Sequence, residues 1–351
     1  MPKKVRFESF VYHFLAEAER AGLRELAERL SFRYDGGRAV VEWDSKQASF
    51  ALAELELYRR GDEDKNRTFF RQAVTEVAQQ AGVALDHARL RAEEAFHDRW
   101  AAEEGGAIDV RAVNEACTSP EMRHIRALLG PLRGKRLLDV GCGLGEASVY
   151  FALEGAQVTA MDLSQGMLDA TSRLARANGV AVATHKAAAE HTGLPADAQF
   201  DIVYAGNLLH HVDIAATIGR LKPHLAPGGV FVSWDPVAYN PVINLYRRIA
   251  TRVRTPDEHP ITRADLRLLE REFGSVQTRF FWLSTLAIFM LMALRGRSPN
   301  RERYWKAVVA ESERWRPLYA PLSRLDDWLL RLFPPLRWWC WNVVVTARDP
   351  R

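Results

Sequence analysis

The chain has 351 residues, of which 48% are apolar, enough for a sizeable core in one large domain or two modest ones. Lys and Arg total 48 against 44 Asp and Glu, so the small basic excess gives no indication of a nucleic-acid partner. The three cysteines are too widely spaced for a zinc site or a disulfide framework and suit a reducing compartment. The N-terminal residues lack the apolar segment of a secretory signal, and we therefore expect a soluble, cytoplasmic protein.

Residues 1–105 are predicted to form a mostly helical N-terminal extension, with a possible role as a lid or in dimerisation. Apolar residues recur at helical spacing over 14–30, and helical patterning resumes at Phe50. Between these stretches, Asp35-Gly36-Gly37 separates two β-prone runs, a pattern typical of a hairpin. The stretch Glu103–Asp109 is predicted to be a linker to a second domain at 106–351.

From about residue 133 the chain alternates short β-rich runs with helix-like segments, which predicts βα units and a mostly parallel sheet. The expected strands are 136–140, 157–162, 181–186, 200–205, 229–234 and 275–282, and a final strand-like segment over 338–349. A turn at Pro227-Gly228-Gly229 is expected to precede the fifth of these strands.

The stretch LLDVGCGLGE (137–146) predicts a buried strand, a glycine turn and the start of a helix. This arrangement places a polar ligand against N–H groups at a helix terminus. A dinucleotide fingerprint has its third glycine three positions after the second, and Glu146 occupies that position, so a dehydrogenase is the weaker match. Asp162 ends the next strand, where an acidic side chain can accept hydrogen bonds from ribose hydroxyls.

These motifs resemble the class I S-adenosylmethionine-dependent methyltransferases, in which an acidic residue precedes G-x-G-x-G. Three further blocks are similar to that family in the same order: AEHTGLP, FDIVYAGN and LKPHLAPGGVFVSWDP. The small-molecule group that includes the ubiquinone and menaquinone enzymes is the most similar. The resemblance implies a Rossmann-like α/β fold whose seven-stranded sheet has the order 3-2-1-4-5-7-6. Helical insertions are expected at 236–261 and 284–337.

The resemblance also implies a binding site for S-adenosyl-L-methionine as cofactor. Its implied residues are Asp139, Gly141, Cys142, Gly143 and Gly145 around the methionine end, Asp162 at the ribose, Leu163, Ala189 and Glu190 at the adenine, and Asn207 at the amino-acid end or a substrate oxygen. Structural roles stay open for the acids. Asp139 could satisfy buried N–H groups, Asp162 could cap the helix beginning at Ser164, and Glu190 could be an exposed loop acid.

The stretch GNLLHHVD (206–213) follows the fourth strand, at the edge where open α/β sheets keep their reactive groups. His210 and His211 are candidate catalytic residues that orient the substrate or accept its proton, since imidazole titrates near neutrality. Either histidine could instead pack under the following helix or cap it. In quinone-precursor O-methyltransferases that this chain resembles, acidic residues and a histidine in this block can hold a divalent metal. Asn207, His210 and His211 occupy comparable places here, and because hard cations prefer carboxylates we expect no metal.

Three segments are candidates for contact with the acceptor. The first follows strand five and supplies Tyr239 (also a catalytic candidate), Asn240, Tyr246, Arg247, Asp257 and His259, unless it is a plain structural connection. The second segment is the apolar stretch 280–294, which is shorter than a membrane span. Its residues 288–292 must be buried in a core, an interface, a substrate tunnel or a membrane surface. The third is a lid carrying Phe96, His97 and Trp100, although aromatics at helical spacing are usually core.

We expect a methyltransferase acting on a small secondary metabolite or a lipid-like acceptor, with a homodimer as a candidate state. The chain lacks the (Asp/Asn)-Pro-Pro-(Tyr/Phe) turn of enzymes that methylate nucleobase or protein amides, which disfavours nucleic acid. Two alternatives stay open. One is a cyclase or lyase of the same fold that consumes the aminobutyrate chain of S-adenosylmethionine and releases methylthioadenosine. The other is a binding subunit without turnover.

Overall fold

The computed structural model of the chain describes residues 2–20, 23–52, 63–82, 85–103, 108–249, 259–298 and 302–351. The chain divides into two compact units, Met1–Phe96 and His97–Arg351. The division falls inside helix α4 (Leu85–Glu103), ahead of the expected boundary between 105 and 106. Residues 104–107 of the expected linker lie outside the described residues.

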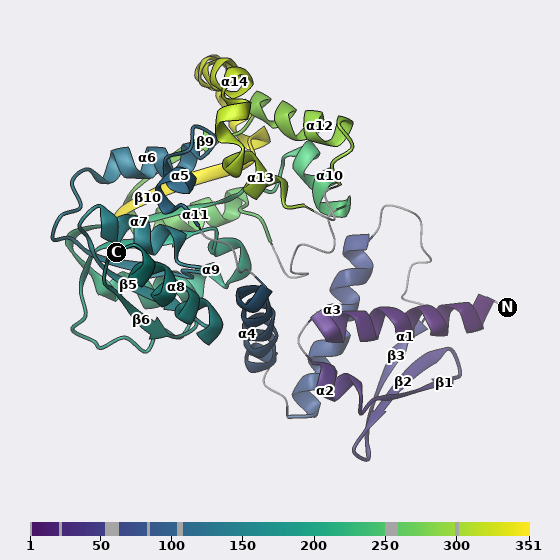
Figure 1. Ribbon diagram of the computed structural model, residues 1–351. Helices are drawn as coiled ribbons and strands as arrows, with labels where there is room; N and C mark the ends of the chain where they lie inside the picture. The colour runs from purple at the N-terminus through teal and green to yellow at the C-terminus, as the bar shows by residue number, and fades with distance from the viewer. Residues whose placement is uncertain are drawn as a thin grey trace. The chain divides into compact units, whose positions relative to one another are not determined.

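The N-terminal unit packs helices against a three-stranded antiparallel sheet (Figure 1). Its elements are α1 (Pro2–Arg20), α2 (Arg24–Ala27), β1 (Ser31–Asp35), β2 (Arg38–Trp43), β3 (Lys46–Ala51) and α3 (Glu63–Gln80). The expected hairpin is confirmed, since Asp35 pairs with Arg38 across a turn in which Gly36 and Gly37 take φ values of 54° and 95°. Both values lie in the left-handed region that favours glycine.

The expected return to helix over 50–60 is wrong at its start, because Phe50 and Ala51 belong to β3, and residues 53–60 lie outside the described residues. Burial alternates along this strand from Gln47: Ala48 and Phe50 are buried, whereas Gln47 and Ser49 are exposed. Phe50 joins an aromatic core around Phe10, with ring centroids 5.8 Å apart. A helical pattern and a strand pattern overlap here, and burial against that core selects the strand.

The C-terminal unit is built on a seven-stranded mixed sheet. Its strands are β4 (Arg136–Val140), β5 (Gln157–Asp162), β6 (Val182–Lys186), β7 (Phe200–Gly206), β8 (Leu225–Pro236), β9 (Phe273–Phe281) and β10 (Asn342–Pro350). Their order is β6-β5-β4-β7-β8-β10-β9, and β10 runs antiparallel to both neighbours. Counted from β4, this is the predicted order 3-2-1-4-5-7-6.

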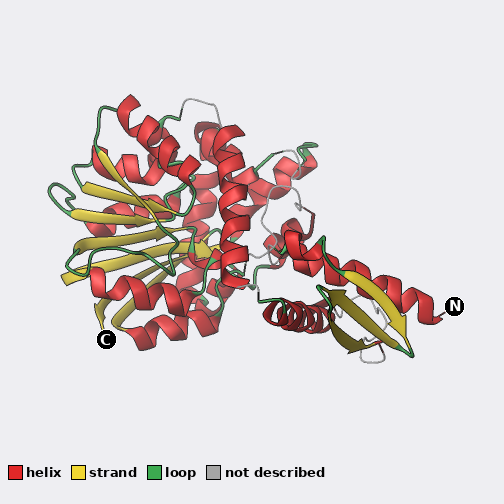
Figure 2. Cartoon of the chain, turned by 90° about the horizontal axis from the view of Figure 1, so that it is seen from below, coloured by secondary structure: helices red, strands yellow, loops and turns green. Residues whose placement is uncertain are grey.

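Helices cover both faces of this sheet (Figure 2). The helices of one face are α5 (Val110–Glu115), α6 (Pro120–Leu129), α7 (Glu146–Leu153) and α8 (Gln165–Ala177); those of the other are α9 (Ile214–Leu221) and α11 (Arg263–Glu272). Successive strand residues supply the two cores, as Leu137 packs on the α5–α8 side and Leu138 on the α9–α11 side. Both leucines are fully buried, as expected for a central parallel strand.

The Pro227-Gly228-Gly229 turn does not precede β8, as predicted, but lies within it. Phe200 of β7 pairs with Leu225, and the next pair joins Ile202 to Val230, so β8 holds three extra residues between two ladder positions. A bulge of this kind accommodates the proline, which has no N–H for the ladder. The last strand also begins later than predicted, because Pro334–Trp339 form a 3₁₀ helix, η6.

The expected insertions contribute a separate helical cluster at the β9–β10 edge. Its helices are α10 (Pro241–Ile249), α12 (Ala287–Leu294), α13 (Tyr304–Ala310) and α14 (Ser312–Leu332). Ile288, Phe289 and Met292 are buried in the core of this cluster, whereas Leu291 is half-buried and Met290 is 54% exposed. A core therefore accounts for three residues of 288–292, and an interface, a tunnel or a membrane surface stays a prediction for Met290. None of the described helices combines the length and apolar character needed to cross a membrane.

Candidate functional site

The turn between β4 and α7 takes a conformation that needs glycine. Gly141, Gly143 and Gly145 have φ values of 71°, 53° and 85°, all left-handed. The Gly141 N–H donates to the Met161 carbonyl at 2.7 Å, which ties the turn to β5. A Cβ on Gly141 would lie 2.7 Å from Cδ1 of Leu208, so the chain after β7 packs directly on this turn.

Gly143 and Gly145 differ in what surrounds them. A Cβ on Gly145 would lie 2.5 Å from the Thr171 hydroxyl and 2.8 Å from the Thr171 Cα, so this glycine is required by packing. A Cβ on Gly143 would meet nothing within 4 Å. The turn therefore leaves open space at Gly143, where a ligand can approach the backbone closely.

Asp162 links the glycine turn to Ser164, the residue that precedes α8. One carboxylate oxygen accepts the Gly143 N–H at 3.0 Å, and the other accepts the Ser164 N–H at 2.9 Å. Ser164, rather than Asp162, caps α8, since its hydroxyl accepts the Met167 N–H. Burial raises the pKa of Asp162, while the two N–H groups and the nearby His97 favour its ionised form.

Asp139 is a second buried acid below the glycine turn. The Ser148 hydroxyl of α7 donates to its carboxylate at 2.5 Å. Burial raises the pKa of Asp139 to about 7; the Ser148 hydrogen bond lowers it, and the negative charge of Asp162 raises it further. A cationic ligand at the turn would reverse this effect by favouring the carboxylate.

Asp98, which no sequence pattern indicates, reaches the same region from the second half of α4. Its carboxylate accepts the Ser164 hydroxyl at 2.5 Å and the Gly166 N–H at 3.0 Å, at the start of α8. On the same helix, the Trp100 ring lies under the Arg303 guanidinium, and the guanidinium carbon is 4.1 Å from the ring centroid. The lid role of Phe96, His97 and Trp100 stays a prediction.

The expected adenine residues lie in and around the loops after β5 and β6. Ala189 and Glu190 are buried, and Leu163 is half-buried. Glu190 is therefore not an exposed loop acid; its carboxylate accepts the Asp213 N–H at 3.3 Å, which links this loop to the start of α9. Cys142 is buried with its thiol against Thr171, and burial raises the pKa of that thiol. A contact between Cys142 and the cofactor stays a prediction.

His210 is buried at the carboxyl edge of the sheet and pairs with Asp235, the acid near the end of β8. The distance from His210 Nδ1 to Asp235 Oδ1 is 2.9 Å, and the same oxygen accepts the His210 backbone N–H at 3.2 Å. Asp235 is 1% exposed, and this burial raises the pKa of its carboxyl group. The backbone N–H groups of His210 and Leu209 lower that pKa, because they favour the carboxylate. Asp235 Oδ2 is buried without a hydrogen-bond partner among the described residues.

Two neighbours of this pair come from the same loop. The His211 ring lies 4.0 Å from that of His210, centroid to centroid, and is less buried. Asn207 is exposed at the end of β7 with a left-handed φ of 56°, and its N–H donates to the Trp234 carbonyl. Asparagine tolerates this backbone better than most residues, which keeps the β7 loop turned outward at the sheet edge.

Tyr239 makes its contacts elsewhere. Its hydroxyl accepts the Arg263 N–H at 3.1 Å, and its ring packs edge-on against Trp338. Asn240 is buried, and its side chain caps the start of α10 through the Ile243 N–H. His259 reaches the histidine pair with its backbone, donating its N–H to the His210 carbonyl at 2.8 Å. Of the other expected entrance residues, Asp257 lies outside the described residues, as does the side chain of Tyr246, and Arg247 contacts Asn244.

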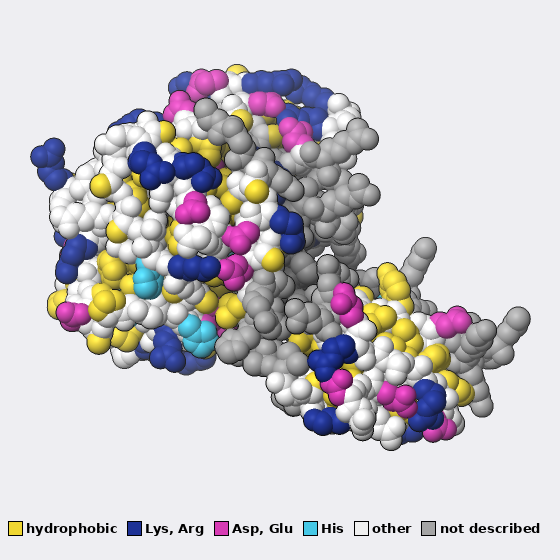
Figure 3. All heavy atoms as spheres, turned by 60° about the horizontal axis from the view of Figure 1, so that its bottom comes forward, with side chains coloured by type: hydrophobic (Ala, Val, Ile, Leu, Met, Phe, Trp, Pro, Cys, Tyr) yellow, Lys and Arg dark blue, Asp and Glu magenta, His cyan; other side chains and the backbone are white. Residues whose placement is uncertain are grey.

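Two further properties bear on the ligand class. The described residues contain no group of three or more His, Cys, Asp or Glu side chains arranged to hold a metal ion. On the face drawn in Figure 3, the described basic side chains are scattered among acidic and apolar ones.

Asp235 could have been found from the sequence, whereas Asp98 could not. The order 1-4-5 makes β7 and β8 neighbours, and both GNLLHHVD and Asp235 lie at their carboxyl ends. An acid beside a histidine at that edge is a recognisable pattern. Asp98 and Ser164 are 66 residues apart, on a helix and a turn whose contact no local pattern predicts.

The comparisons with known proteins agree with this architecture. A family model described as a methyltransferase domain matches residues 138–233. Ubiquinone biosynthesis O-methyltransferase of Azotobacter vinelandii is 35% identical over 161 residues, covering 44% of this chain and 67% of that protein. The protein of the same name from Bordetella parapertussis is 33% identical over 169 residues, covering 46% of this chain and 65%, just under two thirds, of its own length.

Solved structures of low identity are also similar. The N-methyltransferase NodS from Bradyrhizobium japonicum, in complex with S-adenosyl-L-homocysteine, is 12% identical, with a TM-score of 0.42, covering 73% of this chain and 99% of that one. The DhpI complex with the same product is 22% identical, with a TM-score of 0.40, covering 54% and 90%.

The sheet order, the glycine turn with its two acids and the identity to the Azotobacter protein lead to one assignment. The chain belongs to the class I S-adenosylmethionine-dependent methyltransferases, in the group of the ubiquinone biosynthesis O-methyltransferases.

Proposed function

We propose that the protein transfers a methyl group from S-adenosyl-L-methionine to a hydroxyl group of a small, lipid-like or secondary-metabolic acceptor. The observation that carries this proposal is the buried His210–Asp235 pair at the carboxyl edge of the sheet. A histidine held by a carboxylate is suited to accept a proton from a hydroxyl as that oxygen is alkylated. The choice of oxygen follows the names of the relatives, which are O-methyltransferases.

The described residues fit the proposed cofactor. Its sulfonium and ammonium groups are cationic, and Asp139 and Asp162 are buried acids at the glycine turn. The open space at Gly143 gives the ligand a place beside the backbone. Asp162, at the end of β5, would hold the ribose, and Ala189 and Glu190 would border the adenine. When bound, the cofactor supplies an electrophilic methyl group.

The chain's own contribution to the reaction is to position and deprotonate the acceptor. Asp235 accepts the Nδ1–H of His210, which fixes the tautomer with Nε2 as the proton acceptor. The imidazolium that forms is stabilised by the carboxylate in a buried, low-dielectric environment. His211, on the same loop, would orient the acceptor, and Asn207 would bind the amino-acid end of the cofactor or an acceptor oxygen. The roles of Tyr239 and of a homodimer stay predictions.

Product analysis tests the proposal against its two alternatives. The protein is incubated with S-adenosylmethionine alone and then with small phenolic and hydroxylated lipid-like acceptors. S-adenosylhomocysteine that forms only with an acceptor supports methyl transfer. Methylthioadenosine without an acceptor would identify a cyclase or lyase, and tight binding without any product would identify a binding subunit. The named relatives give neither alternative support.

Asp162→Ala should weaken cofactor binding by about 1–3 kcal/mol, because charge-assisted hydrogen bonds to the ribose and the anchor for Gly143 are both lost. Asp169→Ala is the matched control, since Asp169 is an exposed acid on α8 whose hydrogen bond among the described residues is with Gln165 of the same helix. Isothermal titration of both variants measures the difference. Equal affinities in the two variants would overturn the ribose assignment.

Cofactor affinity should increase with pH up to about 7. Burial raises the pKa of Asp139 to about 7, so this carboxyl is protonated in acid, and a bound cation favours its ionised form. Binding below that pH therefore releases a proton. Titrations in two buffers of different ionisation enthalpy measure the release directly. We expect it to disappear in Asp139→Asn, and a release that persists in that variant would assign it to another group.

A further inference from the structure

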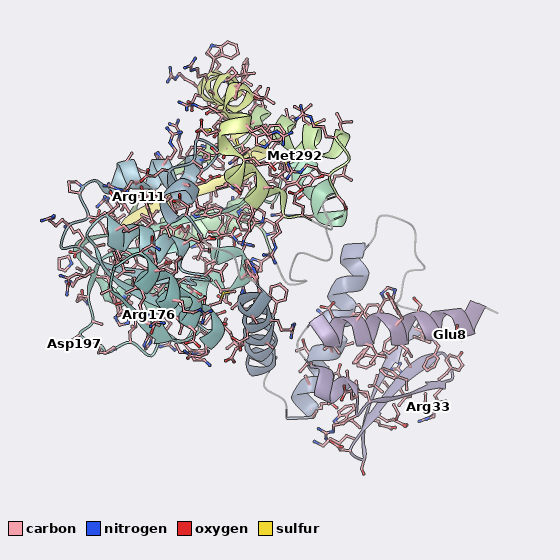
Figure 4. All side chains as sticks on the ribbon, in the orientation of Figure 1. Glu8, Arg33, Arg111, Arg176, Asp197 and Met292 are labelled. Atoms are coloured by element: carbon pink, nitrogen blue, oxygen red, sulfur yellow. The ribbon has the colours of Figure 1, made fainter. Side chains whose placement is uncertain are left out.

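The second half of α4 contacts the start of α8 through one carboxylate. Asp98 is half-buried, and its Oδ1 atom accepts both the Ser164 hydroxyl at 2.5 Å and the Gly166 N–H at 3.0 Å. Both donors stand at the start of α8, whereas Arg176, labelled in Figure 4, marks the last turn of that helix. Ser164 is fully buried, so a partner for its hydroxyl must come from the protein. Asp98 supplies that partner.

The approach of α4 to α8 is close enough to favour glycine at the second position of α8. A Cβ on Gly166 would lie 3.0 Å from Asp98 Oδ1 and 3.3 Å from the Ala101 Cβ, so α4 would have to move by a few tenths of an ångström. Ala101 is buried against Leu144 of the glycine turn and Met167 of α8. The α4 segment 97–103 therefore packs on both the glycine turn and the start of α8.

A chain of hydrogen bonds runs from Asp98 to the glycine turn. The Ser164 hydroxyl donates to Asp98, and the Ser164 N–H donates to Asp162 Oδ1 at 2.9 Å. Asp162 Oδ2 accepts the Gly143 N–H at 3.0 Å. Both Asp162 oxygens are thus held by N–H groups, and each keeps a second lone pair for a ligand hydroxyl. The orientation of the Asp162 carboxylate therefore depends on the position of Ser164, to which Asp98 is bonded.

Asp98 and Asp162 place two negative charges on either side of Ser164, and neighbouring groups compensate for them. The hydrogen bond from Ser164 lowers the pKa of Asp98; partial burial raises that pKa, and the α8 backbone, Lys186 and His97 lower it further. Burial raises the pKa of Asp162, whereas His97 is among the groups that lower it. The positive end of the α8 dipole favours both carboxylates as well. Asp98 therefore serves as a charged acceptor.

We propose that Asp98 is a positioning residue for the cofactor: through Ser164, it holds the Asp162 carboxylate in the orientation that receives the ribose hydroxyl groups. This inference rests on the proposed role of Asp162 at the ribose. A merely structural role, in which α4 supports the fold, would affect every ligand of the site equally. A positioning role affects only ligands that carry those hydroxyl groups.

The experiment is calorimetric titration of the full chain with S-adenosylhomocysteine and with its 2′,3′-dideoxy analogue, which lacks both ribose hydroxyl groups. The wild type should bind S-adenosylhomocysteine more tightly. Asp98→Ala should weaken this binding about ten-fold, because the hydrogen bonds that orient Asp162 are lost, and should leave binding of the analogue unchanged. Asp98→Asn should restore most of the affinity, since both hydrogen bonds go to one oxygen that the amide retains.

Gly166→Ala tests the same contact from α8. The new Cβ would press on Asp98 and Ala101, whereas alanine favours the helix more than glycine does. This variant should show the same selective loss without a loss of thermal stability. Asp169→Ala is the matched control, because it removes an exposed acid from α8 whose described hydrogen bond is with Gln165, and it should discriminate between the two ligands as the wild type does. Thermal unfolding of each variant verifies that it folds.

Three results would overturn the proposal even where the wild type prefers S-adenosylhomocysteine. The first is an equal effect of Asp98→Ala on both ligands, including no effect on either. The second is an Asp98→Asn variant as weak as Asp98→Ala, and the third is the same selective loss in Asp169→Ala. A wild type that binds both ligands equally would instead contradict the ribose role of Asp162, and the role of Asp98 with it.

Discussion

His210→Ala should lower kcat by about 10²–10⁴-fold while leaving the cofactor dissociation constant unchanged. His210 lies at the carboxyl edge of β7, and its Nδ1 is 2.9 Å from the Asp235 carboxylate. Loss of the imidazole removes the proposed proton acceptor but none of the groups at the glycine turn. Initial rates with an acceptor that yields S-adenosylhomocysteine, together with cofactor titration, measure the two effects.

Asp235→Asn distinguishes a positioning role from a merely structural one. The amide retains an oxygen for the His210 backbone N–H but removes the negative charge that stabilises the imidazolium. The pKa of His210 should then be lower than in the wild type, so the acid limb of the kcat profile should move to lower pH and the plateau should fall. A reduced rate with an unmoved limb would indicate that Asp235 only supports the fold.

His211→Ala is the control on the same 3₁₀ turn, η2 (Leu209–His211). The His211 ring lies against that of His210 in a tilted arrangement, but the contact with the Asp235 carboxylate is made by His210. We expect a smaller loss of kcat than in His210→Ala. Wild-type turnover in His210→Ala would assign the proton to water or to the acceptor itself.

Gly145→Ala should lower the free energy of unfolding by about 2–5 kcal/mol. The new Cβ would lie 2.8 Å from the backbone of Thr171, so α7 or α8 must shift, and the left-handed φ of 85° adds strain. Urea denaturation measures the change. Gly145→Ala with wild-type stability would contradict the packing of these two helices at the turn.

Gly143→Ala should separate binding from folding. Its Cβ would enter the open space, so the stability cost should be only the left-handed strain of about 1–2 kcal/mol. Cofactor affinity should fall at least about ten-fold if the ligand occupies that space. Gly134→Ala is the control, because Gly134 has a φ of 77° and open surroundings at the other end of β4. It should show the stability cost without the loss of affinity.

The central strands of the sheet are predictable from the sequence because they are buried on both faces. Apolar runs such as Ile202–Ala205, and the glycine turn at the carboxyl end of β4, identify the βα units and their direction. The bulge within β8 is not predictable, since Pro227-Gly228-Gly229 also suits a plain turn between elements. Phe50 shows the same ambiguity in the N-terminal unit, where tertiary burial selects a strand over a helical pattern.

The proposed cofactor residues can be named from the sequence because they are consecutive or follow expected strands. Asp139, Gly143 and Asp162 form one constellation through β4 and β5, which are adjacent in the sheet. Contacts between distant segments are harder to predict: Asp98 reaches Ser164 from a helix that precedes the sheet. Met290 shows another limit, since an uninterrupted apolar run does not reveal which side of a short helix faces solvent.

The central claim is that the space bounded by the Asp139–Gly145 turn and Asp162 binds S-adenosylmethionine. Calorimetric titration of the wild-type chain with S-adenosylmethionine and, separately, with NAD tests it most directly. We predict saturable binding of the former at one site per chain, weakened in Gly143→Ala and unchanged in Gly134→Ala, and no binding of NAD. Absence of heat with S-adenosylmethionine, or preference for the nicotinamide cofactor, would contradict the assignment of this site.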